Sequence, residues 1–280
     1  MINRKIPWTS QPQYPVEIDW SNPLTKGLRA AVNGTLAFDY VTNKFLTVGS
    51  AGVSKTVSPF GIAHTITTAN ANSYIELPFE LSGAVTVVAI LSRDASVTAA
   101  NDARKIASIA TNKPAGESTF WTFNAGNGFG AAGDFDKPRF STNAAGIGTI
   151  YLDGVALSGN NPATTALVNG KFYVAAATVA SGASSSGAGV TRLMGGYAAA
   201  QSIVGRMPLA LLFDVGKTAD EIKRLSDNPW QIFKSQSRRI WVAGTGTDTP
   251  VNPGVGTIAI TGYAPTVAQT ANQSVLPATG

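Results

Sequence analysis

The sequence predicts an all-β fold, a two-sheet sandwich with one short helix near its C-terminal end. Between residues 27 and 243, short β-like runs alternate with glycine-rich turns, and the 280 residues include 29 glycines. Many short strands at regular spacing are typical of β-sandwiches. Almost the only convincing helix signal lies in the stretch 217–234. One helix is too little for a layer of its own, so the core must form between sheets.

Alternation and apolar runs locate the strands. SYIELP (73–78) alternates, whereas AVTVVAILS (84–92) is continuously apolar, as expected of a strand inside a sheet. GTIYLDGVAL (148–157) predicts two strands around a tight Asp153-Gly154 turn. The runs KIASIAT and STFWTFNAG predict a neighbouring pair. These two runs cover residues 105–111 and 118–126. Further strands are predicted over residues 170–180, 190–197 and 205–217.

The helix carries its own start and stop signals. Thr218 and Glu221 match a T-x-x-E capping box, which satisfies free backbone N–H groups at a helix start. Pro229 ends the helix, because it biases Asn228 away from helical dihedrals and cannot continue the ladder. We expect the helix to cover an open end of the sandwich and Trp230 to hold the chain against it.

Composition divides the chain into four parts. Residues 1–23 are rich in proline and aromatic residues and predict an extended arm. Residues 24–242 carry the sandwich pattern. Residues 243–256 predict a Gly/Thr/Pro linker. Residues 257–280 contain the strand-like run TIAIT and no charged side chain.

The two extensions are candidate assembly contacts. The arm lies either on its own domain or on a neighbouring subunit. The tail is either loosely ordered or adds to the sheet edge of another chain, because a two-stranded element this short is not stable alone. The residues expected to make assembly contacts are Trp8, Tyr14, Trp20, Ile258, Ile260 and Tyr263.

Composition also excludes several classes of protein. The formal charge is +5, but the cations are scattered and no basic, aromatic-rich stripe exists, so we expect no nucleic-acid partner. The absence of cysteine excludes disulfides and thiolate metal sites. No apolar run reaches the length of a membrane span, and the first residues lack the apolar core of a secretory signal, so we expect no membrane insertion.

Both ends of the sandwich region resemble a known family. IDWSNPLTKGL, SPFGIAHTITTANANSYIEL and GRMPLALLFDVGKTADEIKRLSDNPWQIF resemble the first and last strands of laminin-G-like domains, which are concanavalin A-like lectin/glucanase domains. The similarity covers residues 16–233. With RRIW and IAITGYAPTVAQT, it looks most like the laminin-G-like structural proteins of tailed bacteriophages and prophages.

This resemblance implies a jelly-roll sandwich of two curved antiparallel sheets. It also implies a non-enzymatic virion protein, assembled in the bacterial cytoplasm, with other virion proteins as partners. We expect a tail, baseplate or fibre-associated component that contacts host surface polysaccharide. The alternative is a capsid decoration protein with a purely structural role. Homo-oligomerisation is expected, with a trimer as the first expectation because phage fibres are often three-fold.

Catalysis finds little support in the residues. Glucanase relatives need paired carboxylates, and Asp134 and Asp136, at i and i+2, form the nearest pair without any glutamate close by. GFGAAG (128–133) matches a dinucleotide-binding pattern, but Pro138 and a missing helical period argue against it. His64, the only histidine, has no Ser/Asp pattern around it. We expect no enzymatic activity and no cofactor.

Calcium is the metal that accompanies laminin-G-like domains. Asp134 and Asp136 are the first candidate ligands, and Asp94, Asn101 and Asp102 are the second, since calcium needs six to eight oxygen ligands. Each has an alternative interpretation as a turn residue.

A sugar site would use exposed aromatic rings and neighbouring amides. Residues 121–136 combine both, although Trp121 alternates with Phe120, so one of the two belongs to the core. The candidate ligand-binding residues are Trp121, Asn124, Asn127, Phe129, Asp134 and Asp136.

Overall fold

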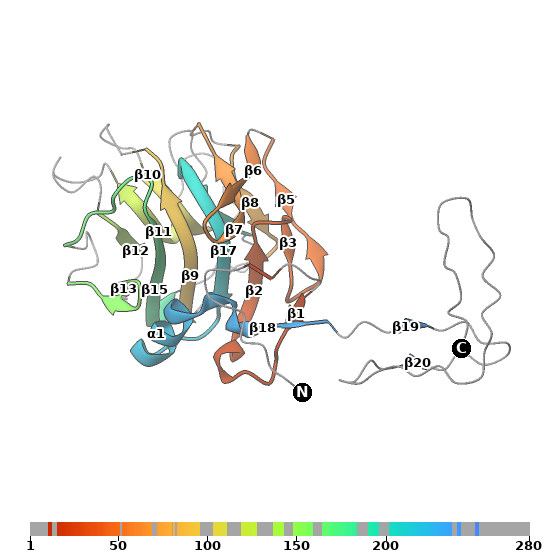
Figure 1. Ribbon diagram of the computed structural model, residues 1–280. Coiled ribbons are helices and arrows are strands. Elements are labelled where there is room, and N and C mark those ends of the chain that lie inside the picture. The colour runs from red at the N-terminus through yellow and green to blue at the C-terminus, as the bar shows by residue number, and fades with distance from the viewer. Residues whose placement is uncertain are drawn as a thin grey trace, which may run out of the picture. The chain divides into compact units, whose positions relative to one another are not determined.

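The computed structural model (Figure 1) describes residues 11–12, 16–50, 52–68, 72–79, 81, 83–95, 103–110, 119–127, 137–142, 148–158, 164–183, 190–195, 202–236, 240–241 and 250–251. The chain divides into two compact units. The sandwich unit comprises Arg4–Gln236, and the second comprises Met1–Asn3 with Ser237–Gly280. In the second unit, β19 (Ile240–Trp241) pairs antiparallel with β20 (Pro250–Val251).

The larger sheet has ten strands, all paired antiparallel. Its order is β14-β13-β15-β9-β17-β2-β3-β4, and β7 pairs with both β17 and β6. The strands are β2 (Leu28–Asn33), β3 (Phe38–Asp39), β4 (Lys44–Phe45), β6 (Val53–Ser58), β7 (Gly61–Ile66), β9 (Gly83–Arg93), β13 (Thr149–Leu152), β14 (Val155–Ala156), β15 (Phe172–Ala183) and β17 (Gly205–Phe213).

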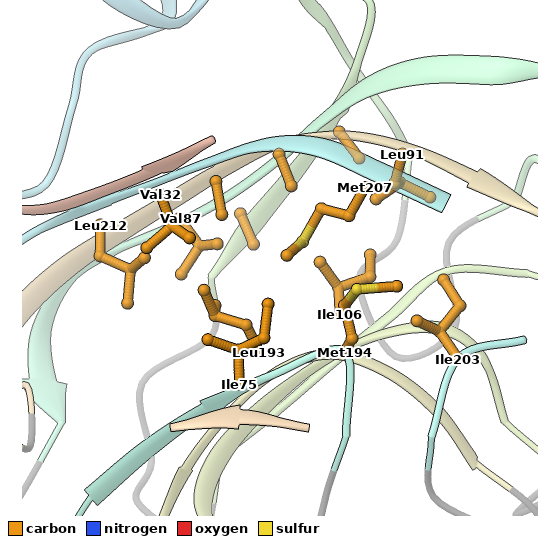
Figure 2. Close-up of a cluster of buried hydrophobic side chains, with 14 of the residues drawn as sticks. Val32, Ile75, Val87, Leu91, Ile106, Leu193, Met194, Ile203, Met207 and Leu212 are labelled. Carbon is orange, nitrogen blue, oxygen red and sulfur yellow. The ribbon is translucent and has the colours of Figure 1, made fainter. Parts of the chain in front are cut away.

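The smaller sheet has six strands, also antiparallel, in the order β12-β11-β10-β16-β8-β5. They are β5 (Thr47–Val48), β8 (Ile75–Leu77), β10 (Ala103–Ala110), β11 (Thr119–Asn127), β12 (Arg139–Thr142) and β16 (Val190–Leu193). The two sheets enclose one hydrophobic core, part of which is drawn in Figure 2. The predicted antiparallel two-sheet sandwich is therefore confirmed.

The central strands of the ten-stranded sheet are buried on both faces. In β9, Val87 and Ala89 enter the core between the sheets, whereas Val88 and Ile90 enter a second core on the outer face. β15 and β17 divide their side chains in the same way. Successive residues of a strand point to opposite faces, so a strand covered on both sides needs a continuous apolar run. This explains the run 84–92.

The outer core is closed by the helix and by the two ends of the sandwich unit. Its cover consists of β1 (Val16–Ile18), η1 (Pro23–Thr25), α1 (Ala219–Asp227), η4 (Pro229–Ile232) and β18 (Phe233–Ser235). The helix therefore covers the outer face of the ten-stranded sheet, and its expected position at an open end of the sandwich was wrong. An open end would need only a plug, whereas this sheet has a whole second face to bury.

The helix signals act as predicted. Thr218 accepts from the backbone N–H of Glu221, and the Glu221 carboxylate accepts from the backbone N–H of Thr218 at 2.9 Å, which completes the capping box. Lys217 is buried beside the cap, with its Nζ 3.1 Å from Glu221 Oε1. Its backbone N–H donates to Thr86 Oγ1 of β9 at 2.9 Å, which ties the helix start to the centre of the sheet.

The hairpin at Asp153-Gly154 also forms as predicted, with Tyr151 opposite Ala156 and Leu152 opposite Val155. Both turn residues have positive φ, +50° and +80°, as a two-residue turn of this type requires. A Cβ atom on Gly154 would lie 3.2 Å from Lys223 Cα of α1. The hairpin therefore packs directly against the helix.

Replacing a buried and an exposed tryptophan should change the free energy of unfolding by very different amounts. Trp230 is fully buried in the outer core, and its Nε1 has no hydrogen-bond partner among the described residues, so packing is what Trp230→Ala removes. We expect a loss of about 3–5 kcal/mol in the free energy of unfolding. Trp20, which is 59% exposed, is the control, and Trp20→Ala should change stability by less than about 0.5 kcal/mol. Urea unfolding followed by circular dichroism measures both, and equal effects would contradict the burial pattern.

Two glycines test the contact between hairpin and helix. Gly154 and Gly170 have similar positive φ, +80° and +76°, but a Cβ on Gly170 would have no atom within 4 Å. Gly170→Ala should cost about 1–2 kcal/mol from backbone strain alone. Gly154→Ala should cost at least about 1 kcal/mol more, because its methyl group crowds α1. Thermal unfolding of the two variants measures this difference. Equal melting temperatures would show that α1 shifts to accept the methyl group without a loss of stability.

Candidate functional site

A groove on the outer side of the sandwich, built from described residues, is a candidate site. Its volume is about 280 Å³. We name it the Trp20 groove. It is lined by Glu17, Ile18, Trp20, Tyr40, Val41, Asn43, Lys234 and Gln236. Most of these residues are polar, and they come from both ends of the sandwich unit and from the β3–β4 turn.

One wall is the antiparallel pair β1–β18. Glu17 lies directly opposite Lys234, and Ile18 opposite Phe233. Val16 and Ile18 point into the outer core, so Glu17 between them points outward, as strand alternation requires. Glu17 Oε1 lies 3.4 Å from Lys234 Nζ. Both side chains are about half exposed, so this ion pair contributes little stability and leaves both groups able to bind a ligand.

Trp20 projects from the turn that follows β1. Asp19 N–H donates to Ile232 O at 2.8 Å, which fixes the start of the turn against η4. Ser21 Oγ donates to Asp19 Oδ1 at 2.6 Å and tightens it. The indole is 59% exposed. A large aromatic side chain on a fixed turn, open to solvent at the edge of a groove, is typical of an interaction site.

The opposite wall is fixed by a buried carboxylate. Asp39, only 1% exposed, accepts from the backbone N–H groups of Ala31 and Val41 at 3.0 Å each. Its Oδ2 also accepts from Thr42 Oγ1 at 2.7 Å. Asn43 completes the turn with φ +56°. The turn is therefore rigid before any ligand binds.

Tyr40 is held from two sides. Its hydroxyl oxygen accepts from Asn33 Nδ2 at 2.9 Å, and its ring packs edge-on against Phe233 at 5.6 Å between centroids. The groove thus presents two oriented aromatic rings, a carboxylate, an ammonium group and two carboxamides. Glu17 is its only carboxyl group, whereas glycoside hydrolysis uses two. This arrangement suits binding of an uncharged polar ligand.

The sequence-predicted sugar site divides between described and undescribed residues. Trp121, Asn124 and Asn127 lie on β11. Phe129, Asp134 and Asp136 lie outside the described residues. Trp121 pairs with Thr142 of β12, and Asn124 pairs with Arg139. The sugar site over these six residues stays a prediction.

Of the calcium candidates, the structure describes Asp94, and its carboxylate is engaged by other side chains. Asp94 forms a two-point ion pair with Arg206, at 2.8 Å and 3.0 Å, and accepts from Ser92 Oγ at 2.7 Å. Asn101, Asp102, Asp134 and Asp136 lie outside the described residues. No group of three His, Asp or Glu residues suited to a metal ion occurs in the described ranges.

Of the expected assembly residues, the structure describes Trp20, which lines the groove. Trp8, Tyr14, Ile258, Ile260 and Tyr263 lie outside the described residues, so their role stays a prediction. One arm residue is placed on its own domain: Gln11 is buried, and its Oε1 accepts from Ile62 N–H at 2.8 Å. Sequence reasoning missed Glu17, Tyr40 and Lys234, because their proximity depends on the long-range pairing of β1 with β18.

His64 is a structural residue of β7. It is 2% exposed, and its Nε2 lies 3.0 Å from Asn33 O and 3.2 Å from Leu36 O. Carbonyl oxygens only accept hydrogen bonds, so Nε2 carries the proton. Burial lowers the pKa of His64 below its usual value, against the two backbone hydrogen bonds, and the charge of Lys55 lowers it further.

The stability of the chain should therefore respond to pH through this single histidine. The folded pKa is lower than the unfolded pKa of about 6.5, so the unfolded state binds the extra proton. Stability is full above about pH 6.5 and falls below it, by at most about 1.4 kcal/mol per pH unit. Urea unfolding at pH 7.5 and 5.5 measures the loss. His64→Gln should show a smaller difference, and an equal one would assign the effect to other groups.

No family model and no curated protein matches the sequence. Among solved structures, a Trypanosoma rangeli sialidase in complex with sialic acid is similar at 12% identity, with a TM-score of 0.42 over 71% of this chain. The match covers 32% of the sialidase, so this chain spans about a third of that protein. Domain 4 of an extracellular arabinanase from Geobacillus stearothermophilus, in complex with arabinotriose, is similar at 11% identity and a TM-score of 0.42, covering 71% of this chain and 98% of that domain. No helix in the described ranges is long and apolar enough to cross a membrane.

Proposed function

We propose that this chain is a non-enzymatic structural component of a tailed-bacteriophage particle, placed in the tail or baseplate, whose sandwich contacts host surface glycans. The observation that carries the glycan contact is the Trp20 groove. Its exposed indole offers an apolar face to a sugar ring, and its polar lining offers donors and acceptors to the hydroxyl groups. Ligand sites combine an apolar surface with a few placed polar groups in this way.

The charge of the groove favours a neutral ligand. Glu17 and Lys234 are the only charged residues in its lining, and they balance each other at 3.4 Å. A sugar hydroxyl both donates and accepts a hydrogen bond, so it can bind the ammonium group, the carboxylate and the carboxamides of Asn43 and Gln236. A strongly anionic ligand would need surplus cations, which this lining does not offer.

The assembly role rests on the position of the two extensions and on the resemblance to phage proteins. Val16, the first residue of β1, pairs with Ser235, the last residue of β18. The C-terminal segment therefore leaves the domain beside the start of β1, whereas the N-terminal arm already contacts the domain at the buried Gln11. A segment that continues beyond the last strand of the domain is suited to holding it on a neighbouring particle protein.

The glycan contact is tested by replacing Trp20. We expect the full chain to bind neutral members of an array of bacterial surface glycans, and Trp20→Ala to weaken that binding at least tenfold, about 1.4 kcal/mol. Isothermal titration with the best array glycan gives the affinities. Val57→Ala, at a side chain that is 80% exposed on β6 and outside the groove, is the control and should bind normally. Equal glycan affinity of wild type and both variants would show that the Trp20 groove does not bind the glycan.

The particle role has a separate test. Cryo-electron microscopy of phage particles that contain this chain should place its density in the tail or baseplate, with the Trp20 groove accessible from outside. Density on the capsid shell would instead favour a decoration protein, and absence of the chain from purified particles would contradict both.

A further inference from the structure

One short segment forms the edge of both sheets. In residues 44–48, β4 ends the ten-stranded sheet and β5 ends the six-stranded sheet, and Leu46 between them is buried in the core. β3, to which β4 pairs, and β5 lie on the same side of the sandwich (Figure 1). An edge strand presents backbone N–H and C=O groups to any chain that can pair with them.

This edge carries exposed apolar side chains next to the exposed Lys44. Phe45 is 76% exposed and Val48 is 40% exposed. The Phe45 ring packs edge-on against Phe38 at 5.2 Å, and Phe38 packs against Tyr40 at 5.1 Å. The rings form a continuous aromatic row that ends at the solvent. Exposed aromatic residues held in place by their neighbours are typical of protein interfaces.

The chain itself contains a segment suited to this edge. Residues 257–261, TIAIT, alternate in the strand period, so Ile258 and Ile260 would lie on one face of an added strand. No charged residue occurs after Asp248. Pairing this segment against Phe45 would therefore bury apolar surface, and the segment brings no charge of its own out of water.

We propose that residues 257–261 of a second copy of this chain add as a strand to the edge formed by residues 44–48. Backbone hydrogen bonds supply the pairing, and the isoleucines cover Phe45 and Val48. This mode of association, in which an extended segment lengthens an existing sheet, is well known in protein recognition. It needs no glycan and no other particle protein, so it stands or falls independently of the proposed function.

Other edges are available to the same segment. β14, with Val155 66% exposed, ends the ten-stranded sheet at its other side, and β6 is a further edge strand. β6 pairs with β7 alone, and its Val57 is 80% exposed. However, β6 carries the exposed Lys55 near its middle, whereas the exposed Lys44 lies at the first residue of the 44–48 edge, and a central lysine discourages pairing along an edge. The experiment must therefore separate the 44–48 edge from the others.

Light scattering coupled to size exclusion measures the mass of the full chain. We expect wild type to be a dimer or larger, and Phe45→Ser to be monomeric because the accepting edge has lost its aromatic anchor. The double variant Ile258→Asp, Ile260→Asp should also be monomeric, because its segment can no longer cover the edge. Val48→Lys is a second acceptor variant should Phe45→Ser fail to fold. Val57→Ser and Val275→Asp are matched controls on the β6 edge and elsewhere in the tail, and both should assemble like wild type.

Mixing the two defective variants decides the result. Phe45→Ser retains the donor segment and the isoleucine variant retains the accepting edge, so an equal mixture should form a heterodimer. That outcome also shows that both variants are folded. A monomeric wild type, an unchanged mass in both variants, dissociation by Val57→Ser, or a mixture that stays monomeric would each overturn the proposal.

Discussion

The double-sided burial of three central strands governs this structure. β9, β15 and β17 send alternate side chains into two separate cores, so the ten-stranded sheet needs a cover on each face. The six-stranded sheet covers one face. The other is covered by elements from both ends of the sandwich unit, including α1 and the fully buried Trp230. This requirement explains why a chain of short strands contains one well-capped helix, and why an aromatic run follows it directly.

Features determined by neighbours in the sequence could be predicted, and features determined by distant pairing could not. The capping box at Thr218, the stop at Pro229 and the hairpin at Asp153 depend on a few adjacent residues, and all three form as expected. The position of the helix depends on which face of which sheet lacks a cover. That is decided by the strand order, in which β9 pairs with β15 and β17 from much later in the chain. Apolar content alone therefore indicated burial without indicating the face.

The same distinction applies to the candidate site. Aromatic and amide residues between positions 121 and 136 predict a sugar site because they are neighbours in the sequence. The Trp20 groove instead joins residues more than two hundred positions apart, through the pairing of Glu17 with Lys234. Its sequence signal is limited to short alternation in VEI and to an exposed tryptophan after it. Recognising it required knowledge that β1 and β18 are partners.

The β1–β18 pair also has a mechanical consequence. Val16 and Ser235 lie opposite each other at one end of a three-residue antiparallel ribbon, and the extensions on both sides continue from that end. Tension on the C-terminal extension would therefore separate β18 from β1 one residue pair at a time, whereas tension on the N-terminal arm first meets the buried Gln11 and its hydrogen bond to Ile62. Since Glu17, Ile18 and Lys234 line the Trp20 groove, the wall of the groove is also the first part of the domain to open when the C-terminal extension is pulled. The residues that would contact a ligand are thus the same residues that would separate first under load.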